Sequence, residues 1–239
     1  MKNKSALCLA AITLAAFAAC ADPLRGELDL YCPEDHFLFR TIDNDTAVEI
    51  TGYVGGRIDV RIPPYIRGLP VTVIGERAFV GGEWIPDENW EFVFVAGHQL
   101  ASVAIPDNVT NIARAAFIEN RLASVSISDG VTYIGGDAFA GNQLTYVYIP
   151  NGITSIEGGA FADNQLTFVT IPENVTHIWH QAFARNNLTG VIIPNSVIHI
   201  DRFAFTLNEL TYVVIPNSEV WVCGSAFDYP EVTVTIGID

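Results

Sequence analysis

Apolar residues recur along most of the chain at intervals of 22 residues. Each unit has the form L-T-x-V-x-I-P-x-x-V-T-x-I-x-x-x-A-F-x-x-N-x. The opening leucine occurs at Leu100, Leu122, Leu144, Leu166, Leu188 and Leu210. The Ala-Phe pair occurs at 116–117, 138–139, 160–161, 182–183, 204–205 and 226–227. Because so many columns stay aligned over six copies, the pattern indicates a repeat architecture.

Each column of the repeat has a structural interpretation. In the first copy, Leu100, Val103 and Ile105 can point inward from a short extended segment. Ser102 and Ala104 then point outward. The proline after the isoleucine ends this strand because it has no N–H to donate. The Val-Thr-x-Ile run forms a second inward-facing stretch, and Ala-Phe places a small residue beside a large ring on the wide side of the coil.

A further column consists of asparagines near the end of each unit. Its members are Asn120, Asn142, Asn164, Asn186 and Asn208. A stack of asparagines can satisfy buried backbone groups of the loops, which would otherwise lack partners. We favour this structural role over a ladder of polar ligand contacts.

One 22-residue coil cannot bury its own apolar face, so neighbouring coils must stack to make a core. The predicted fold class is therefore a mainly β repeat solenoid, a right-handed coil that occupies residues 53–227. Residues 21–52 are predicted to cap its N-terminal end, and residues 228–239 its C-terminal end.

Both predicted caps rest on local strand patterns. Phe37–Arg40 and Ala47–Tyr53 flank Asp43-Asn44-Asp45, which is typical of a hairpin. Near the C-terminus, Val232, Val234 and Ile236 alternate with polar residues and predict a closing strand with these three side chains on one face.

The regular spacing is interrupted at residues 80–96. Phe79 and Leu100 are 21 residues apart, whereas Phe117 and Leu122 are five apart. Residues 92–95 can pair as a strand. The segment is either a degenerate repeat or a loop folded back onto the coil, or it is an exposed binding lip. The lip would be formed by Trp84 and Trp90, since insertions in solenoids often lie on the binding face.

The repeats resemble the BspA-type leucine-rich repeats of bacterial surface proteins, in which Ala-Phe replaces the helix of longer repeats. The resemblance extends from residue 53 to about residue 227. A first unit with a longer turn, from Ile58 through Pro63 to Ala78-Phe79, supports it. The resemblance implies a cell-surface binding protein that adheres to host or neighbouring-cell proteins.

Residues 1–20 are typical of an export signal. Lys2 and Lys4 precede an apolar stretch, residues 7–19, that is too short to span a bilayer. Two cleavage sites compete. Phe17-Ala18-Ala19-Cys20 resembles a lipobox, in which acylated Cys20 would anchor an outer-membrane or cell-surface lipoprotein. Alternatively, Ala19-Cys20-Ala21 fits an ordinary signal-peptidase site and would release a secreted or periplasmic protein.

Charge and motif content narrow the function further. Without the signal, ten arginines face 27 acidic residues, a net charge of −17. Such a surface repels nucleic acids and anionic membranes, so we expect no nucleic-acid partner and membrane contact only through a lipid anchor at Cys20. The sequence contains no phosphate-binding loop or zinc motif, and no lysine follows Lys4. We therefore expect no enzyme activity and no cofactor.

Histidines and cysteines offer little further chemistry. His177 and His199 share a column and should lie one coil apart, at roughly 5 Å. We interpret them as surface histidines and predict no metal site. Cys32 and Cys223 lie at opposite ends of the solenoid and should not pair, because a disulfide needs Cα atoms within about 7 Å.

The outward side chains of the Leu-Thr-x-Val-x-Ile strand form two columns on one face. The first column contains Ser102, Ser124, Tyr146, Phe168, Gly190 and Tyr212, and the second contains Ala104, Ser126, Tyr148, Thr170, Ile192 and Val214. Cross-strand packing alone could explain these residues, but contiguous exposed aromatics also mark interaction sites. The predicted ligand-binding face comprises Tyr146, Tyr148, Phe168, Ile192, Tyr212 and Val214. Gly190 should leave a notch in it, and the partner is an extracellular protein or, alternatively, a glycan.

Overall fold

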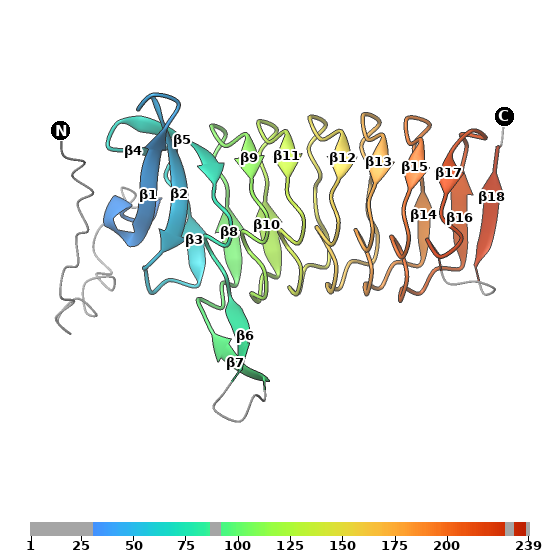
Figure 1. Ribbon diagram of the computed structural model, residues 1–239, viewed down its shortest axis with the longest axis horizontal. Helices are drawn as coiled ribbons and strands as arrows, with labels where there is room; N and C mark the ends of the chain where they lie inside the picture. The colour runs from blue at the N-terminus through green and yellow to red at the C-terminus, as the bar shows by residue number, and fades with distance from the viewer. Residues whose placement is uncertain (1–30, 87–91, 228–231, 238–239) are drawn as a thin grey trace. The chain divides into compact units, whose positions relative to one another are not determined.

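The 22-residue units form successive coils that stack along one axis (Figure 1). The computed structural model describes residues 31–86, 92–227 and 232–237, and residues 31–239 make up one unit by their contacts. Cys20 and the proposed export signal lie outside the described residues. Within the described part, no helix is long and apolar enough to cross a membrane.

Two sets of short parallel strands run along the coil. The first set comprises β3 (Asp59–Arg61), β8 (Ser102–Ala104), β10 (Ser124–Ser126), β14 (Gly190–Ile192), β16 (Tyr212–Ile215) and β18 (Thr233–Ile236). The strand expected in each Leu-Thr-x-Val-x-Ile segment is absent at 144–149 and 166–171, so this set divides into two sheets. The second set comprises β5 (Leu69–Ile74), β9 (Asn111–Ile112), β11 (Tyr133–Ile134), β12 (Ser155–Ile156), β13 (His177–Ile178), β15 (His199–Ile200) and β17 (Trp221–Val222).

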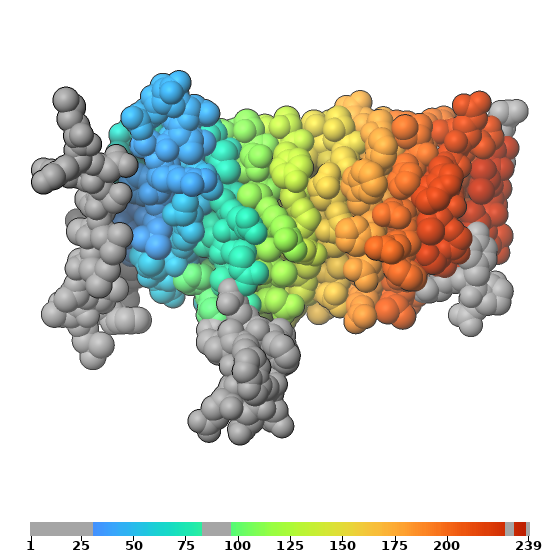
Figure 2. Space-filling view, in the orientation of Figure 1, coloured from blue at the N-terminus to red at the C-terminus, as the bar shows by residue number. Residues whose placement is uncertain are grey.

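The strand register follows the sequence repeat. Ser124 pairs with Ser102 and Ile134 pairs with Ile112, so residues 22 apart lie side by side. On the described face in Figure 2, successive coils form adjacent bands of colour that pack against one another. The predicted mainly β solenoid is confirmed.

The core is a set of stacked columns. The Ala-Phe phenylalanines form a continuous ladder of rings whose centroids lie 5.0 to 5.8 Å apart. Its members are Phe79, Phe117, Phe139, Phe161, Phe183, Phe205 and Phe227, each at most 2 % exposed. Because burial of one large side chain stabilises by roughly 1.5–3 kcal/mol, stacking supplies the stability that a single coil lacks.

The asparagine column has the structural role expected of it. In one coil, the Asn142 Oδ1 accepts a hydrogen bond from the backbone N–H of Leu122 at 3.0 Å. The Asn142 Nδ2 donates to the carbonyls of Phe117 at 2.9 Å and Phe139 at 3.1 Å. Each asparagine thus ties two neighbouring coils together, and the prediction is confirmed.

The N-terminal end is capped by a hairpin, as the sequence predicts. β1 (Phe37–Ile42) pairs antiparallel with β2 (Ala47–Tyr53), and β2 pairs in parallel with β5 of the first coil. Asp43, Asn44 and Asp45 in the connecting turn all have positive φ angles. A short 3-10 helix, η1 (Glu34–His36), precedes the hairpin, and β4 (Tyr65–Ile66) pairs antiparallel with β5.

The predicted closing strand is present as β18, which pairs in parallel with β16. Burial decreases along it: Val232 is buried and Val234 is partly buried, whereas Ile236 is 50 % exposed. The closing strand therefore packs against the last coil mainly through its first residues. Cys32 and Cys223 are both free thiols, as expected from their positions.

The inserted segment contains an antiparallel hairpin of β6 (Gly82–Pro86) and β7 (Phe92–Ala96). In Figure 1 its strands extend away from the coil, so the hypothesis of a loop folded back onto the coil is wrong. The base is held by a 2.8 Å hydrogen bond from the Gly81 N–H to the Ile118 carbonyl. Trp84 lies in β6, where only the backbone is described, and Trp90 lies outside the described residues.

Candidate binding face

The predicted face lies on the outward side of the Leu-Thr-x-Val-x-Ile segments of four successive coils. Ile192, Tyr212 and Val214 lie in strands β14 and β16, whereas Tyr146, Tyr148 and Phe168 lie in segments that form no strand. Gly190 pairs with Tyr212 and Ile192 with Val214, so the two outward columns are rows of neighbours. The side chains of Tyr146, Tyr148, Phe168, Ile192 and Tyr212 are between 41 % and 63 % exposed, and Val214 is half-buried. These residues therefore form one surface, which we call the strand face.

Aromatic contacts and one hydrogen bond order this surface. The rings of Tyr146 and Phe168 lie 5.2 Å apart at an angle of 36°. The Tyr148 hydroxyl donates a 2.6 Å hydrogen bond to the Asp129 carboxylate in the preceding coil. This bond raises the pKa of Tyr148, because the carboxylate favours the protonated phenol. Both contacts join adjacent coils and fix the rings before any partner arrives.

The notch predicted at Gly190 is partly filled. A Cβ atom added at Gly190 would overlap the ring of Tyr212, which leans across the glycine. The space directly above Gly190 is therefore taken by the side chain one coil further, and the predicted notch lies between that ring and Phe168. The glycine is needed for this ring position.

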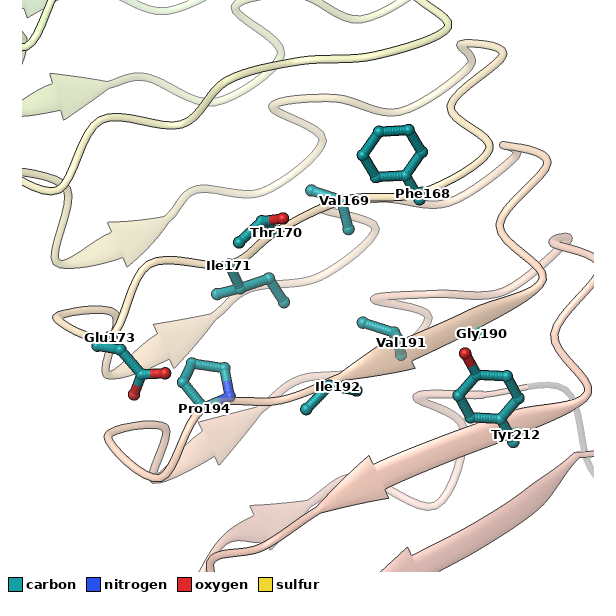
Figure 3. A pocket seen from close by; sticks show the side chains of 10 residues that line it. All are labelled: Phe168, Val169, Thr170, Ile171, Glu173, Gly190, Val191, Ile192, Pro194 and Tyr212. Carbon is teal, nitrogen blue, oxygen red and sulfur yellow. The ribbon is translucent and has the colours of Figure 1, made fainter.

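A hollow nevertheless lies beside this ring, with a volume of about 370 Å³. It runs along the strand direction between two coils (Figure 3). Phe168 and Tyr212 stand at one end, Ile192 lies near the middle, and Glu173 and Pro194 stand at the other end. The strand face thus contains a shallow depression with an aromatic end and an acidic end.

A second aromatic cluster lies on the other strand set. His177 lies in β13 and Trp179 directly follows that strand, while His199 lies in β15 and Trp221 in β17. The centroids of their contacting rings lie 4.5 to 5.7 Å apart. The paired histidines lie 5.7 Å apart, close to the predicted spacing. Within the described residues, no group of three or more His, Cys, Asp or Glu could hold a metal ion.

Sequence reasoning missed that the two tryptophans join these histidines. The signal was available: Trp221 continues the column of His177 and His199, and Trp179 lies two residues after His177 on the same strand face. Cross-strand ring stacking of this kind stabilises a sheet by about 0.2–1 kcal/mol per pair, so the cluster has a structural explanation.

Residues 90–211 match the family model described as a BspA type Leucine rich repeat region, in six copies. No curated protein matches the chain. Among solved structures, the chain is similar to a leucine rich cell surface protein from Faecalibacterium prausnitzii, with 28 % identity and a TM-score of 0.54. That alignment covers 79 % of this chain and 55 % of the other, so the chain spans little more than half of that protein.

Two further structures share the fold. A leucine-rich repeat protein from Bacteroides ovatus is 20 % identical, with a TM-score of 0.55 and coverage of 84 % of this chain and 66 % of that one. The pneumococcal vaccine antigen PcpA is 21 % identical, with a TM-score of 0.54 and coverage of 80 % and 48 %.

Proposed function

The chain belongs to the BspA-type leucine-rich-repeat family, and we propose that it is a bacterial cell-surface or secreted binding protein whose strand face mediates adhesion to proteins of host or neighbouring cells. The description of the Faecalibacterium prausnitzii structure as a cell surface protein supports the location. The proposed role is binding and not catalysis.

The observation that carries this proposal is the exposure of aromatic side chains on the strand face. Coil stacking requires an inward Leu, Val and Ile in each unit, but it does not require Tyr146, Phe168 or Tyr212 to point outward. Cross-strand packing of two rings contributes only about 0.2–1 kcal/mol. Contiguous exposed rings are otherwise typical of the anchors in protein interfaces.

A glycan-binding module of the cell envelope is the second candidate. It is favoured by one observation, the hollow of about 370 Å³ flanked by Phe168 and Tyr212. Aromatic faces pack against the apolar faces of sugar rings, and a depression of this size can hold a small saccharide.

A binding panel separates the two candidates. The mature chain and a variant with Tyr146, Phe168 and Tyr212 changed to Ala would be probed against extracellular-matrix proteins and a glycan array. Tyr65→Ala and Tyr133→Ala are matched controls, because both tyrosines are exposed and lie off the strand face. We expect protein binding that the triple variant loses and the controls keep. Binding to neither array, or full binding by the triple variant, would overturn the proposal.

We further propose that Cys20 carries a lipid anchor in the outer membrane or at the cell surface. Mass spectrometry of the mature N-terminus tests this: a diacylglyceryl mass on Cys20 supports the anchor. A free N-terminus at Asp22 would instead support a secreted or periplasmic protein.

A further inference from the structure

The strand face and its adjoining turns carry no positive charge. In six successive coils, the strand and turn segments contain no Lys, Arg or His: they are 100–108, 122–130, 144–152, 166–174, 188–196 and 210–218. The acids in these segments are Asp107, Asp129 and Glu173. The field at this surface is therefore negative, and it favours a cationic partner.

Glu173 is the acid that adjoins the hollow. Its side chain is exposed and lines the end opposite the aromatic rings (Figure 3). Among the described residues, no ion pair is found for Glu173, whereas acids such as Glu49, Asp137 and Asp163 pair with arginines. Asp129, by contrast, already accepts the hydroxyl of Tyr148. Glu173 is thus available to a partner group.

The aromatic end of the hollow also suits a cation. The side chains of Phe168 and Tyr212 are about half exposed, and a cation near the face of an aromatic ring is attracted by the negative ring quadrupole. A planar guanidinium group stacks on a ring more readily than an ammonium group does. The apolar side chain of Ile192, between the two ends, can cover the methylene stem of a long basic side chain.

From this arrangement we propose that the hollow binds arginine side chains from an extended basic segment of the partner protein. One guanidinium group lies against Phe168 and Tyr212. A second basic side chain, further along the same face of the extended segment, faces Glu173. This inference rests on the proposed function and specifies the chemistry of the partner. A neutral sugar could use the rings and donate hydroxyl hydrogen bonds to Glu173, but it would gain nothing from the absence of positive charge.

Acetylated tetra-arginine amide is the probe, and tetra-citrulline is its neutral analogue of nearly equal shape. Binding to the mature chain would be measured by isothermal titration calorimetry at two salt concentrations. Glu173→Gln removes the acid, and Asp107→Asn removes the same charge from the same turn column, away from the hollow. Phe168→Leu keeps an apolar side chain but removes the ring, and Tyr65→Leu is its control.

We expect tetra-arginine to bind at least about tenfold more tightly than tetra-citrulline. Glu173→Gln and Phe168→Leu should each weaken binding by about threefold or more, the range of exposed ion pairs and cation–π contacts. Asp107→Asn and Tyr65→Leu should change it by less than about 1.5-fold. Equal losses for Glu173→Gln and Asp107→Asn would show diffuse attraction to an acidic protein and would overturn the proposal, as would unchanged binding by Phe168→Leu.

The result is separable from the proposed function. If the triple alanine variant loses an extracellular protein partner while Glu173→Gln leaves tetra-arginine binding unchanged, the arginine inference fails and the adhesion proposal stands. If the tetra-arginine results are as expected but no extracellular protein binds, the arginine site is supported and the adhesion proposal fails.

Discussion

Replacement of Asn164 by Ala tests how far the asparagine column holds the coils together. The Asn164 Oδ1 accepts the backbone N–H of Leu144 at 3.0 Å. The Nδ2 donates to the carbonyls of Phe139 at 2.9 Å and Ala162 at 3.0 Å. Asn164 is only 7 % exposed, so water cannot readily replace these bonds.

The free-energy cost of Asn164→Ala depends on which backbone groups lose all their hydrogen-bond partners. The Phe139 carbonyl keeps a hydrogen bond from Asn142, and the Ala162 carbonyl keeps one from the Gly141 N–H. The Leu144 N–H loses the acceptor that holds it. An orphaned buried N–H costs about 1–3 kcal/mol, and each weakened carbonyl adds roughly 0.5 kcal/mol or more. We expect Asn164→Ala to lower the free energy of unfolding by about 2–4 kcal/mol.

Urea denaturation of the mature chain, followed by tryptophan fluorescence and circular dichroism, measures this loss. The two probes must agree, because a repeat array can lose coils separately. Asn174→Ala is the control: Asn174 donates to the Asn151 carbonyl at 2.7 Å on the exposed turn, so its loss should cost less than about 0.5 kcal/mol. A loss below about 1 kcal/mol for Asn164→Ala, or equal losses for both variants, would refute the reasoning.

Three further predictions address single positions. Gly190→Ala should displace the Tyr212 ring and alter ligand binding, yet shift the melting temperature by no more than about 3 °C, because the exposed ring can rotate away; a larger shift in calorimetry would contradict this. Phe203 is exposed and has a φ angle of 59°, a conformation that glycine adopts without strain. Phe203→Gly should therefore leave the free energy of unfolding unchanged or raise it by up to about 1 kcal/mol. The control Ile198→Gly, also at an exposed position, should lower the free energy of unfolding. Burial, with a smaller contribution from Asp163, raises the pKa of the Glu119 carboxyl group. The folded protein therefore binds the carboxyl proton more tightly than the unfolded chain does. The stability gained from this proton at low pH is lost as the pH rises through the folded-state pKa. Glu119→Gln should thus raise the melting temperature at pH 7 but not at pH 3.5, and equal shifts at both would refute the assignment.

The stacked columns could be predicted from sequence because one period determines them. Leu144 and Leu166, or Asn142 and Asn164, occupy equivalent positions in copies of equal length, so stacking brings them together whatever the details of the loops. The candidate face followed from the same register, since outward positions such as Tyr146 alternate with inward ones.

Features that depend on side-chain conformation or on departures from the repeat were harder to predict. The glycine at position 190 predicted a notch, but the Tyr212 side chain fills part of that space. Its rotamer cannot be derived from the sequence repeat. β7 was expected to pair as a strand, whereas its partner β6 lies in an acidic segment with glycine and proline, which favour turns. The absence of basic residues from the strand face is visible in the sequence. It pointed to a cationic partner only after the structure placed Glu173 beside the hollow.

The strand face itself can be tested by hydroxyl-radical footprinting of the mature chain, free and bound to the extracellular protein that the panel selects. Side-chain oxidation, quantified by mass spectrometry, reports solvent access to individual rings. We predict that binding protects Tyr146, Phe168 and Tyr212, and that Tyr133 and Trp221 on the other strand set react as in the free protein. Protection of Tyr133 and Trp221, with the three strand-face rings still fully reactive, would contradict the account.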